Sequence, residues 1–249
     1  MTAASFSEVG ERIEGVEGWL TEAQAEVLYG AARRCPAGGR IVEIGSFRGR
    51  STIVLASAAP DEVEVIAIDP HAGNDRGPRE IAGYAEAAAT DAQAFAANLA
   101  RAGVSGRVRH LPLFSADALG EVDGPIDVLY IDGAHRFGPA NDDLRAWGGR
   151  VTDGGTMLVH DAFSSVGVTA ALFAQARRAP RRYRYLGRAG SLAVFAVGPL
   201  DRRSWAASFL RQCAQLPWFG RNVVIKALIA AHLGRLTGLL GHHDATWPY

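Results

Sequence analysis

The stretch Val42-Glu43-Ile44-Gly45-Ser46-Phe47-Arg48-Gly49-Arg50-Ser51-Thr52 decides the fold of this chain. An apolar run that begins at Ile41 ends at the first glycine, and a helical pattern begins at the second arginine. These residues predict a strand, a tight loop and a helix start in close succession. The two glycines would let the backbone turn sharply and a ligand approach closely. The N–H groups at the helix start favour polar or anionic ligand groups.

This loop separates two classes of nucleotide cofactor. A dinucleotide-binding loop needs Gly-x-Gly-x-x-Gly, but the bulky Phe47 stands at the second glycine position. The chain instead reads Glu-x-Gly-x-x-x-Gly, which resembles the first motif of class I S-adenosylmethionine (SAM) methyltransferases. The resemblance implies that the loop holds the amino-acid end of SAM, through Glu43, Gly45, Ser46, Gly49 and Ser51. The alternatives are an ordinary strand–helix turn in a ligand-free domain and a NAD-linked oxidoreductase.

Composition limits the class of protein. A chain of 249 residues with 48% apolar content can bury one large core, with or without a small appendage. Lys+Arg and Asp+Glu both number 26, so no overall field favours nucleic acid. Cys35 and Cys213 lie far apart, which argues against a disulfide framework and fits a reducing, cytoplasmic location. We expect neither a signal peptide nor a membrane span.

The rest of the chain alternates between strand and helix patterns. Strands are expected at residues 41–44, 63–68, 108–113, 126–131, 155–159, 183–186 and 192–197, and helices at 22–34, 91–102, 142–147 and 168–178. Such alternation predicts an α/β fold, a Rossmann-like, doubly wound and mostly parallel sheet with helices on both faces. The last two strands lack a helix between them, so one strand should run antiparallel. This count resembles the seven-stranded methyltransferase fold over residues 22–198.

Two segments fall outside that core pattern. Residues 71–89 mix glycine, charge and alanine just after a strand, where a lid or acceptor-binding loop is expected. We divide the chain into a methyltransferase domain, residues 1–199, and a C-terminal helical extension, residues 200–249. The extension predicts helices at 201–215 and 221–240, separated by Pro217. These helices would pack on the core, on a second subunit in a homodimer, or on a membrane surface.

Polar residues follow several strands of the predicted sheet, where open α/β sheets bind their ligands. Asp69 ends the second strand, and the resemblance implies that it accepts the ribose hydroxyls of SAM. Ser115 and Asp117 follow the third strand, near the expected adenine, although Asp117 would equally serve as a helix cap. Residues 141–143, Asn-Asp-Asp, are expected to cap the following helix or to contact the acceptor.

The strongest signal lies after strands four and five, where Asp132, His135, His160 and Asp161 gather. Methyl transfer is an in-line displacement, and an alcohol attacks poorly until its proton leaves. Imidazole can take that proton, and a divalent cation held by carboxylates lowers the pKa of the hydroxyl. The pattern therefore predicts a base and a metal site beside the cofactor motif.

These residues resemble those of methyltransferase family 24 and of the metal-dependent O-methyltransferases that modify sugar hydroxyls. There an Asp-x-x-His pair supplies a metal ligand and the general base, which implies these roles for Asp132 and His135. Asp132 would also line the cofactor site. A second pair, usually Glu-Asp, maps onto His160 and Asp161, so the implied metal ligands are Asp132, His160 and Asp161. Imidazole suits manganese, iron or zinc better than magnesium, or else His160 acts on substrate.

The sequence thus predicts a SAM-dependent O-methyltransferase that acts on a sugar or small polyol, with His135 as base and Mg²⁺ or Mn²⁺ as metal. One alternative drops the metal and leaves His135 to deprotonate the acceptor alone. Another is a non-catalytic adaptor that docks through the arginines between residues 177 and 188 and through the C-terminal helix. Few aromatics and zero net charge argue against nucleic acid as the partner of those arginines.

Overall fold

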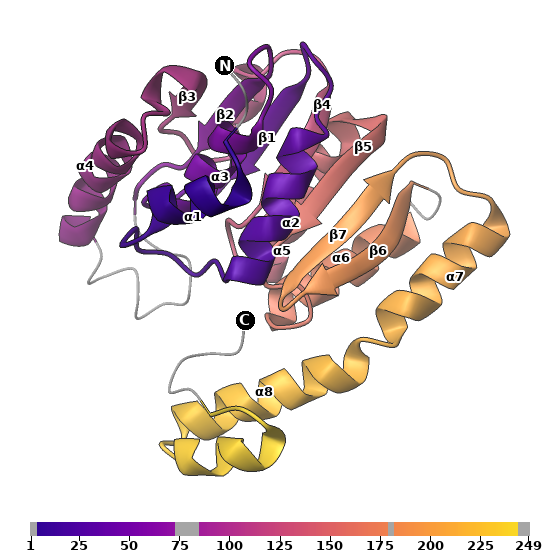
Figure 1. Ribbon diagram of the computed structural model, residues 1–249. Coiled ribbons are helices and arrows are strands. Elements are labelled where there is room, and N and C mark those ends of the chain that lie inside the picture. Colours follow the sequence, from indigo (N-terminus) through magenta and orange to yellow (C-terminus); the bar gives the residue numbers. More distant parts are fainter. Residues whose placement is uncertain (1–3, 73–84, 179–181, 244–249) are drawn as a thin grey trace.

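Seven strands form one sheet in the order β3-β2-β1-β4-β5-β7-β6 (Figure 1). The strands are β1 (Arg40–Ile44), β2 (Glu64–Ile68), β3 (Val108–Leu111), β4 (Ile126–Ile131), β5 (Val151–Val159), β6 (Tyr183–Ala189) and β7 (Leu192–Val197). This computed structural model describes residues 4–72, 85–178 and 182–243. Strands β1 to β5 pair in parallel, and β7 pairs antiparallel with both β5 and β6. The predicted mostly parallel sheet with one reversed strand is therefore confirmed.

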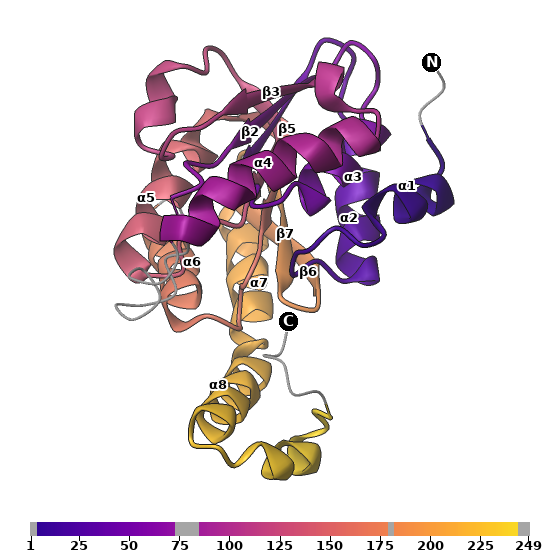
Figure 2. The ribbon, with the colours of Figure 1, turned by 90° about the vertical axis from the view of Figure 1, so that its left-hand side faces the viewer.

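Helices cover both faces of the sheet (Figure 2). They are α1 (Phe6–Ile13), α2 (Glu22–Arg33), α3 (Arg50–Ala58), α4 (Ala85–Arg101), α5 (Phe137–Ala146), α6 (Val166–Arg178), α7 (Arg202–Cys213) and α8 (Leu216–Ala230). Short 3₁₀ turns are η2 (Ser105–Arg107), η3 (Asp117–Gly120), η4 (Gly148–Arg150) and η5 (Gly234–Leu240). Helices α1 to α4 pack on one face of the sheet, and α5 and α6 pack on the other.

The alternation of side chains along β1 explains how the two cores are built. Ile41 lies in the core beneath α1 to α4, whereas Val42 and Ile44 lie in the opposite core with α5 and α6. Successive residues of a strand point to opposite faces, so Glu43 must share the face of Ile41. Because β2 and β4 flank β1 in the sheet, the strand order reverses between β1 and β4. That reversal marks the ligand-binding crevice of open α/β folds.

Four helices differ from the prediction, and one of them, α4, begins at Ala85 rather than at residue 91, within the segment expected to form a lid. The chain forms α1 in residues that carried no assignment, and Ser5 and Glu8 close a capping box at its start. A serine followed three residues later by a glutamate is typical of a helix start, so this pair could have predicted α1 from the sequence. Helix α5 begins at Phe137 rather than at residue 142, so residues 141–143 lie inside it and do not cap it. Pro217 lies in the first turn of α8, where a proline is tolerated, and so does not precede the helix.

The C-terminal part leaves the sheet at β7. Helix α7 packs on β6, where the Tyr185 N–H donates to the Ser208 hydroxyl at 2.8 Å. Helix α8 then ends at Ala230, and the chain folds back through η5, so the single helix expected at 221–240 was wrong. Within the described residues, no helix is both long and apolar enough to cross a bilayer. Most of the predicted lid, residues 73–84, lies outside the described residues.

Candidate active site

The loop between β1 and α3 owes its glycines to contacts inside the chain. Gly45 and Gly49 both have φ of 86°. A Cβ on Gly45 would lie 2.3 Å from the carbonyl oxygen of Asp132, and one on Gly49 would lie 2.7 Å from a methyl of Leu99. Both sites therefore require glycine for close packing against neighbouring elements. At both glycines the atoms that approach most closely belong to the protein, and these contacts explain the glycines without a ligand.

Glu43 lies behind this loop and is fully buried. Its two carboxyl oxygens accept hydrogen bonds from the hydroxyls of Ser51 and Thr52 on α3. Burial raises the pKa of Glu43 to about 8, although both hydroxyl bonds act in the opposite direction. The structure thus joins Glu43 to Ser51 on the helix face, and their direct contact with SAM stays a prediction.

Asp69 ties the first two strand ends together. One carboxyl oxygen accepts the Phe47 N–H at 2.7 Å, and the other accepts the His71 N–H at 2.8 Å. Phe47 has a φ of 44°, an uncommon conformation for a large residue, which this hydrogen bond supports. The acid expected to bind ribose therefore also fixes the shape of the glycine loop.

Ser46 offers the observation that best fits a cofactor. Its hydroxyl is buried and has no hydrogen-bond partner among the described residues. A buried polar group without a partner costs free energy unless a ligand or water satisfies it. An unsatisfied hydroxyl in this loop, at the topological switch point, therefore fits a polar group of the methyl donor.

Ser115 and Asp117, both expected near the adenine, lie in different environments. The Ser115 hydroxyl donates to Asp143 on α5 at 2.5 Å, whereas Asp117 is exposed in the first turn of η3. Burial raises the pKa of Asp143 to about 6, against the effect of the Ser115 hydrogen bond. Asp143, expected to cap α5, therefore anchors the loop after β3. The adenine roles of Ser115 and Asp117 stay predictions.

The ends of β4 and β5 bring three predicted residues together. Asp132, His135 and Asp161 each offer a ligand atom, and these atoms lie within 4.8 Å of one another. The His135 Nε2 lies 2.5 Å from a carboxyl oxygen of Asp161, which is buried and adopts a φ of 54°. The Tyr130 hydroxyl donates to Asp132 at 3.0 Å from the buried side of the strand.

His160 lies behind this group and is only 2% exposed. Its Nδ1 is 3.2 Å from Asp132 and 3.5 Å from Asp161, and its Nε2 is 3.4 Å from the side-chain oxygen of Gln24. Burial alone would lower the pKa of His160, but the two carboxylates outweigh it and raise that pKa to about 10. The imidazolium therefore bridges the two aspartates from within the fold.

The same pairings set the charge of Asp161. Burial alone would raise its pKa, but hydrogen bonds from His135 and His160 hold that pKa well below its usual range. Of the predicted metal ligands, Asp132 and Asp161 thus group with His135, while His160 supports both from behind. Sequence analysis did not identify Gln24 in this role, because a capping-box position already accounts for a glutamine there.

A pocket opens at this edge of the sheet. Its lining includes the polar residues Asp132, His135 and His160 and the apolar residues Ala140, Leu144 and Val168. The pocket's free volume of about 10 Å³ has room for about one water molecule, so an acceptor would need the lining side chains to move apart. Its place at the carboxyl ends of β4 and β5, beside the β1 loop, puts it where an acceptor could meet a donor bound at the switch point.

Comparison with known families identifies the central part of the chain. Residues 42–162 match the family model Methyltransf_24, described as a methyltransferase domain. The match begins within β1 and ends just after Asp161, so it covers the glycine loop and every strand end described above. The interpretation as a dinucleotide-linked oxidoreductase gains no support from it.

Solved structures of methyltransferases share the fold. The O-methyltransferase NovP is 19% identical with a TM-score of 0.58, over 76% of this chain and 88% of its own. TomG, an O-methyltransferase from Streptomyces achromogenes solved with SAM, is 19% identical with a TM-score of 0.55, over 80% and 93%. A Bacillus cereus O-methyltransferase solved with SAH (S-adenosylhomocysteine) is 17% identical with a TM-score of 0.56, over 79% and 93%. At these identities the likeness establishes the fold.

Proposed function

We propose that this chain is a class I, SAM-dependent methyltransferase, since residues 42–162 match a methyltransferase domain, and that it methylates a hydroxyl oxygen of a small-molecule acceptor. The structural neighbours include several proteins described as O-methyltransferases, which supports oxygen as the nucleophile. The proposed acceptor is a sugar or another small polyol, in keeping with the Asp-x-x-His pair formed by Asp132 and His135.

The pair of His135 and Asp161 carries this proposal. At 2.5 Å, Asp161 can accept a hydrogen bond from the Nε2–H of His135 and so orient the ring, which leaves Nδ1 to act as base. Nδ1 has no hydrogen-bond partner among the described residues. As the acceptor oxygen attacks the methyl carbon, the carbon–sulfur bond breaks and the hydroxyl proton passes to His135. The products are the methyl ether, S-adenosylhomocysteine and a protonated imidazole.

The cofactor side of the site would position the other reactant. The buried hydroxyl of Ser46 would form a hydrogen bond with a polar group of SAM. Asp69 would hold the loop that carries Ser46 in place through the Phe47 N–H. The methyl donor supplies an electrophilic carbon on a positively charged sulfur. Fixing the two reactants in line is worth several orders of magnitude in rate without further chemistry.

A metal-assisted variant is the second candidate, and the clustering of ligand atoms favours it. Asp132, Asp161 and His135 would hold a divalent cation, and two carboxylates with one imidazole suit Mn²⁺ better than Mg²⁺. Such an ion supplies Lewis acidity that lowers the pKa of a bound hydroxyl. If His135 binds the metal through the nitrogen that now faces Asp161, Asp161 no longer orients the ring. The two variants therefore make different predictions for metal removal.

One assay tests the proposal and separates its variants. The chelator-treated protein would be incubated with isotopically labelled SAM and a panel of glycosides, vicinal diols, phenols and amines. Label transfer to hydroxyl acceptors is the expected result, and transfer confined to amines would overturn the proposal. Activity that returns only with Mn²⁺ or Mg²⁺, and metal binding by calorimetry that is lost in Asp161→Ala, would establish the metal-assisted variant.

A further inference from the structure

The C-terminal extension differs in charge from the rest of the chain. Residues 202–243 hold six of the 26 Lys and Arg residues and none of the 26 Asp and Glu residues. The cations are Arg202, Arg203, Arg211, Arg221, Lys226 and Arg235. With Asp201 and Asp244 included, the extension of residues 200–249 holds six cations against two acids, whereas residues 1–199 hold 20 cations against 24 acids.

The beginning of α8 is fixed to the body. Asn222 is fully buried and donates to the Phe163 carbonyl at 3.2 Å, and Lys226 donates to the Ser164 carbonyl at 3.0 Å. The Arg188 guanidinium lies 3.7 Å from the centre of the Trp218 ring. The helix is thus held against the loop that follows Asp161, and its direction is set by the fold.

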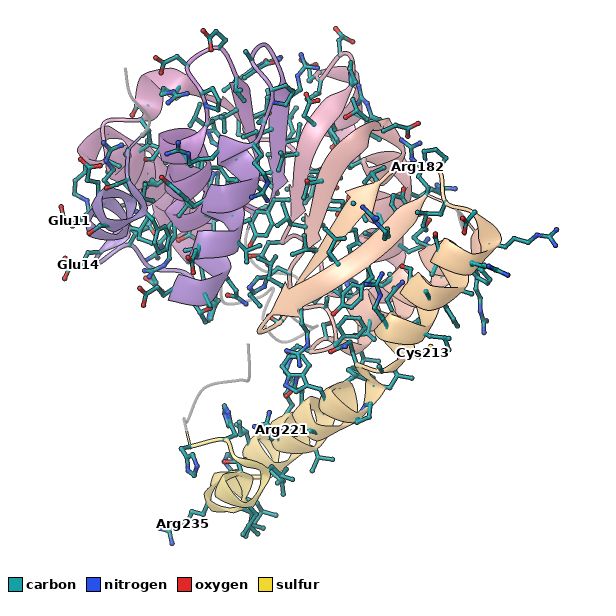
Figure 3. All side chains as sticks on the ribbon, turned by 45° about the vertical axis from the view of Figure 1, so that its right-hand side comes forward. Glu11, Glu14, Arg182, Cys213, Arg221 and Arg235 are labelled. Carbon is teal, nitrogen blue, oxygen red and sulfur yellow. The ribbon has the colours of Figure 1, made fainter. Side chains whose placement is uncertain are left out.

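The far end of α8 and η5 projects from the body (Figures 1 and 2). Figure 3 shows Arg221 and Arg235 on this projection, away from the sheet. Arg221 donates to the carbonyls of Leu240 and Gly241, at 2.7 and 3.0 Å, which closes η5 back on the helix. Thr237 is buried within this turn. The projection is therefore a folded hairpin.

Large apolar side chains on this hairpin lack cover within the described residues. Leu239 is 86% exposed and Leu233 is 50% exposed. Of the eleven exposed large apolar side chains in the described residues, six lie in the extension: Leu210, Leu216, Val224, Leu233, Leu236 and Leu239. An apolar helix is normally buried on all sides. Exposed apolar side chains that gather on one projecting element mark an interaction site.

We propose that this hairpin docks the protein on the surface of an anionic phospholipid bilayer. Leucines at the tip would enter the headgroup region, and the surrounding arginines would contact lipid phosphates. A second copy of the chain explains the surface less well. A two-fold symmetric contact places the same patch against itself, which would bring together Arg221, Lys226 and Arg235 of each copy with no acid of α8 or η5 to balance them. An anionic surface complements the charge and covers the leucines at once.

Vesicle flotation with the full-length protein tests this inference. Vesicles would contain phosphatidylcholine alone, or phosphatidylcholine and phosphatidylglycerol in equal parts. Binding to the anionic vesicles alone, weakened by salt, is expected. Arg235→Gln should lower the partition constant about fivefold, which corresponds to about 1 kcal/mol per cation near such a surface. Leu236→Ser with Leu239→Ser should abolish binding.

Matched controls change equally exposed residues elsewhere. Leu186→Ser on β6 and Arg145→Gln on α5 should bind like the unmodified protein, because both side chains are exposed but lie outside the hairpin. Circular dichroism would establish that all variants are folded. Absence of vesicle binding, or equal binding to neutral vesicles, would overturn the inference. So would self-association that depends on the same leucines while no vesicle is bound, which would assign the hairpin to a second copy.

Discussion

The two halves of the sheet's carboxyl edge neutralise their acids in different ways. At β1 and β2, Glu43 accepts two hydroxyls and Asp69 accepts two backbone N–H groups, donors that keep their protons at any ordinary pH. At β4 and β5, Asp132 and Asp161 instead lie against imidazoles. The first arrangement holds a ligand loop in one shape. The second can move a proton, which is the difference between binding a cofactor and using it.

Removal of His135 should cause the largest loss. We expect His135→Ala to lower kcat by about 10²- to 10⁴-fold, the usual contribution of a general base. The affinity for S-adenosylhomocysteine should stay unchanged, because the cofactor half of the edge keeps its contacts. Steady-state kinetics and calorimetry measure the two effects separately. The exposed His232 provides the control in His232→Ala, and a His135 variant with full activity would refute the division between the two halves.

His160 should matter for stability as well as activity. Its folded pKa of about 10 lies above the ordinary 6.5, so its stabilising effect is complete below pH 6.5 and is lost as pH rises through 10. His160→Asn leaves two carboxylates without the imidazolium between them. We expect the free energy of unfolding at neutral pH to fall by about 3–5 kcal/mol, as when one partner of a buried pair is removed.

Urea unfolding at several pH values checks this expectation. The unmodified protein should lose stability as pH rises toward 10, and His160→Asn should lose the part of that dependence that His160 causes. Equal unfolding free energies for both proteins at neutral pH would show that His160 does not bridge the aspartates.

Asp69 tests the cofactor half with a smaller effect. In Asp69→Asn, the amide nitrogen would face one of the two N–H groups that the carboxylate now accepts. We expect S-adenosylhomocysteine to bind about 10- to 100-fold more weakly, the equivalent of about 1.4–2.8 kcal/mol. The kcat at saturating SAM should stay close to normal. Asp142→Asn, a change at an exposed aspartate of α5, is the matched control. A loss of kcat without a loss of affinity would contradict the comparison.

Glu43 should produce the smallest effect, visible only in the pH dependence of stability. Its folded pKa of about 8 exceeds the ordinary 4.5, so its stabilising contribution is complete below pH 4.5 and is lost as pH rises through 8. Glu43→Gln cannot ionise. Its unfolding free energy should therefore fall less between pH 5 and 9 than that of the unmodified protein, in thermal or urea melts. Glu26→Gln on the surface of α2 is the control, and parallel pH profiles would show that Glu43 does not change its charge on unfolding.

Local patterns predicted much of the fold. Short apolar runs predicted all seven strands, because strands that are buried on both faces consist of nearly continuous apolar residues. The missing helix between the last two strands predicted the reversed strand. The start of α5 was not predicted because Arg136 gives it no side-chain cap, and the polar residues 141–143 inside the helix imitate a helix start.

By itself, the sequence determined the order of elements, the glycine loop and the placing of Asp132, His135, His160 and Asp161 at two strand ends. These are properties of neighbours along the chain, fixed by backbone sterics and by the side-chain period of strands. Only the tertiary structure decided which partners those residues have. It grouped His135 with Asp161, placed His160 behind them against Gln24, and turned Glu43 toward α3. Such pairings join residues far apart in the chain, and burial in a shared, weakly polar interior then sets their charge.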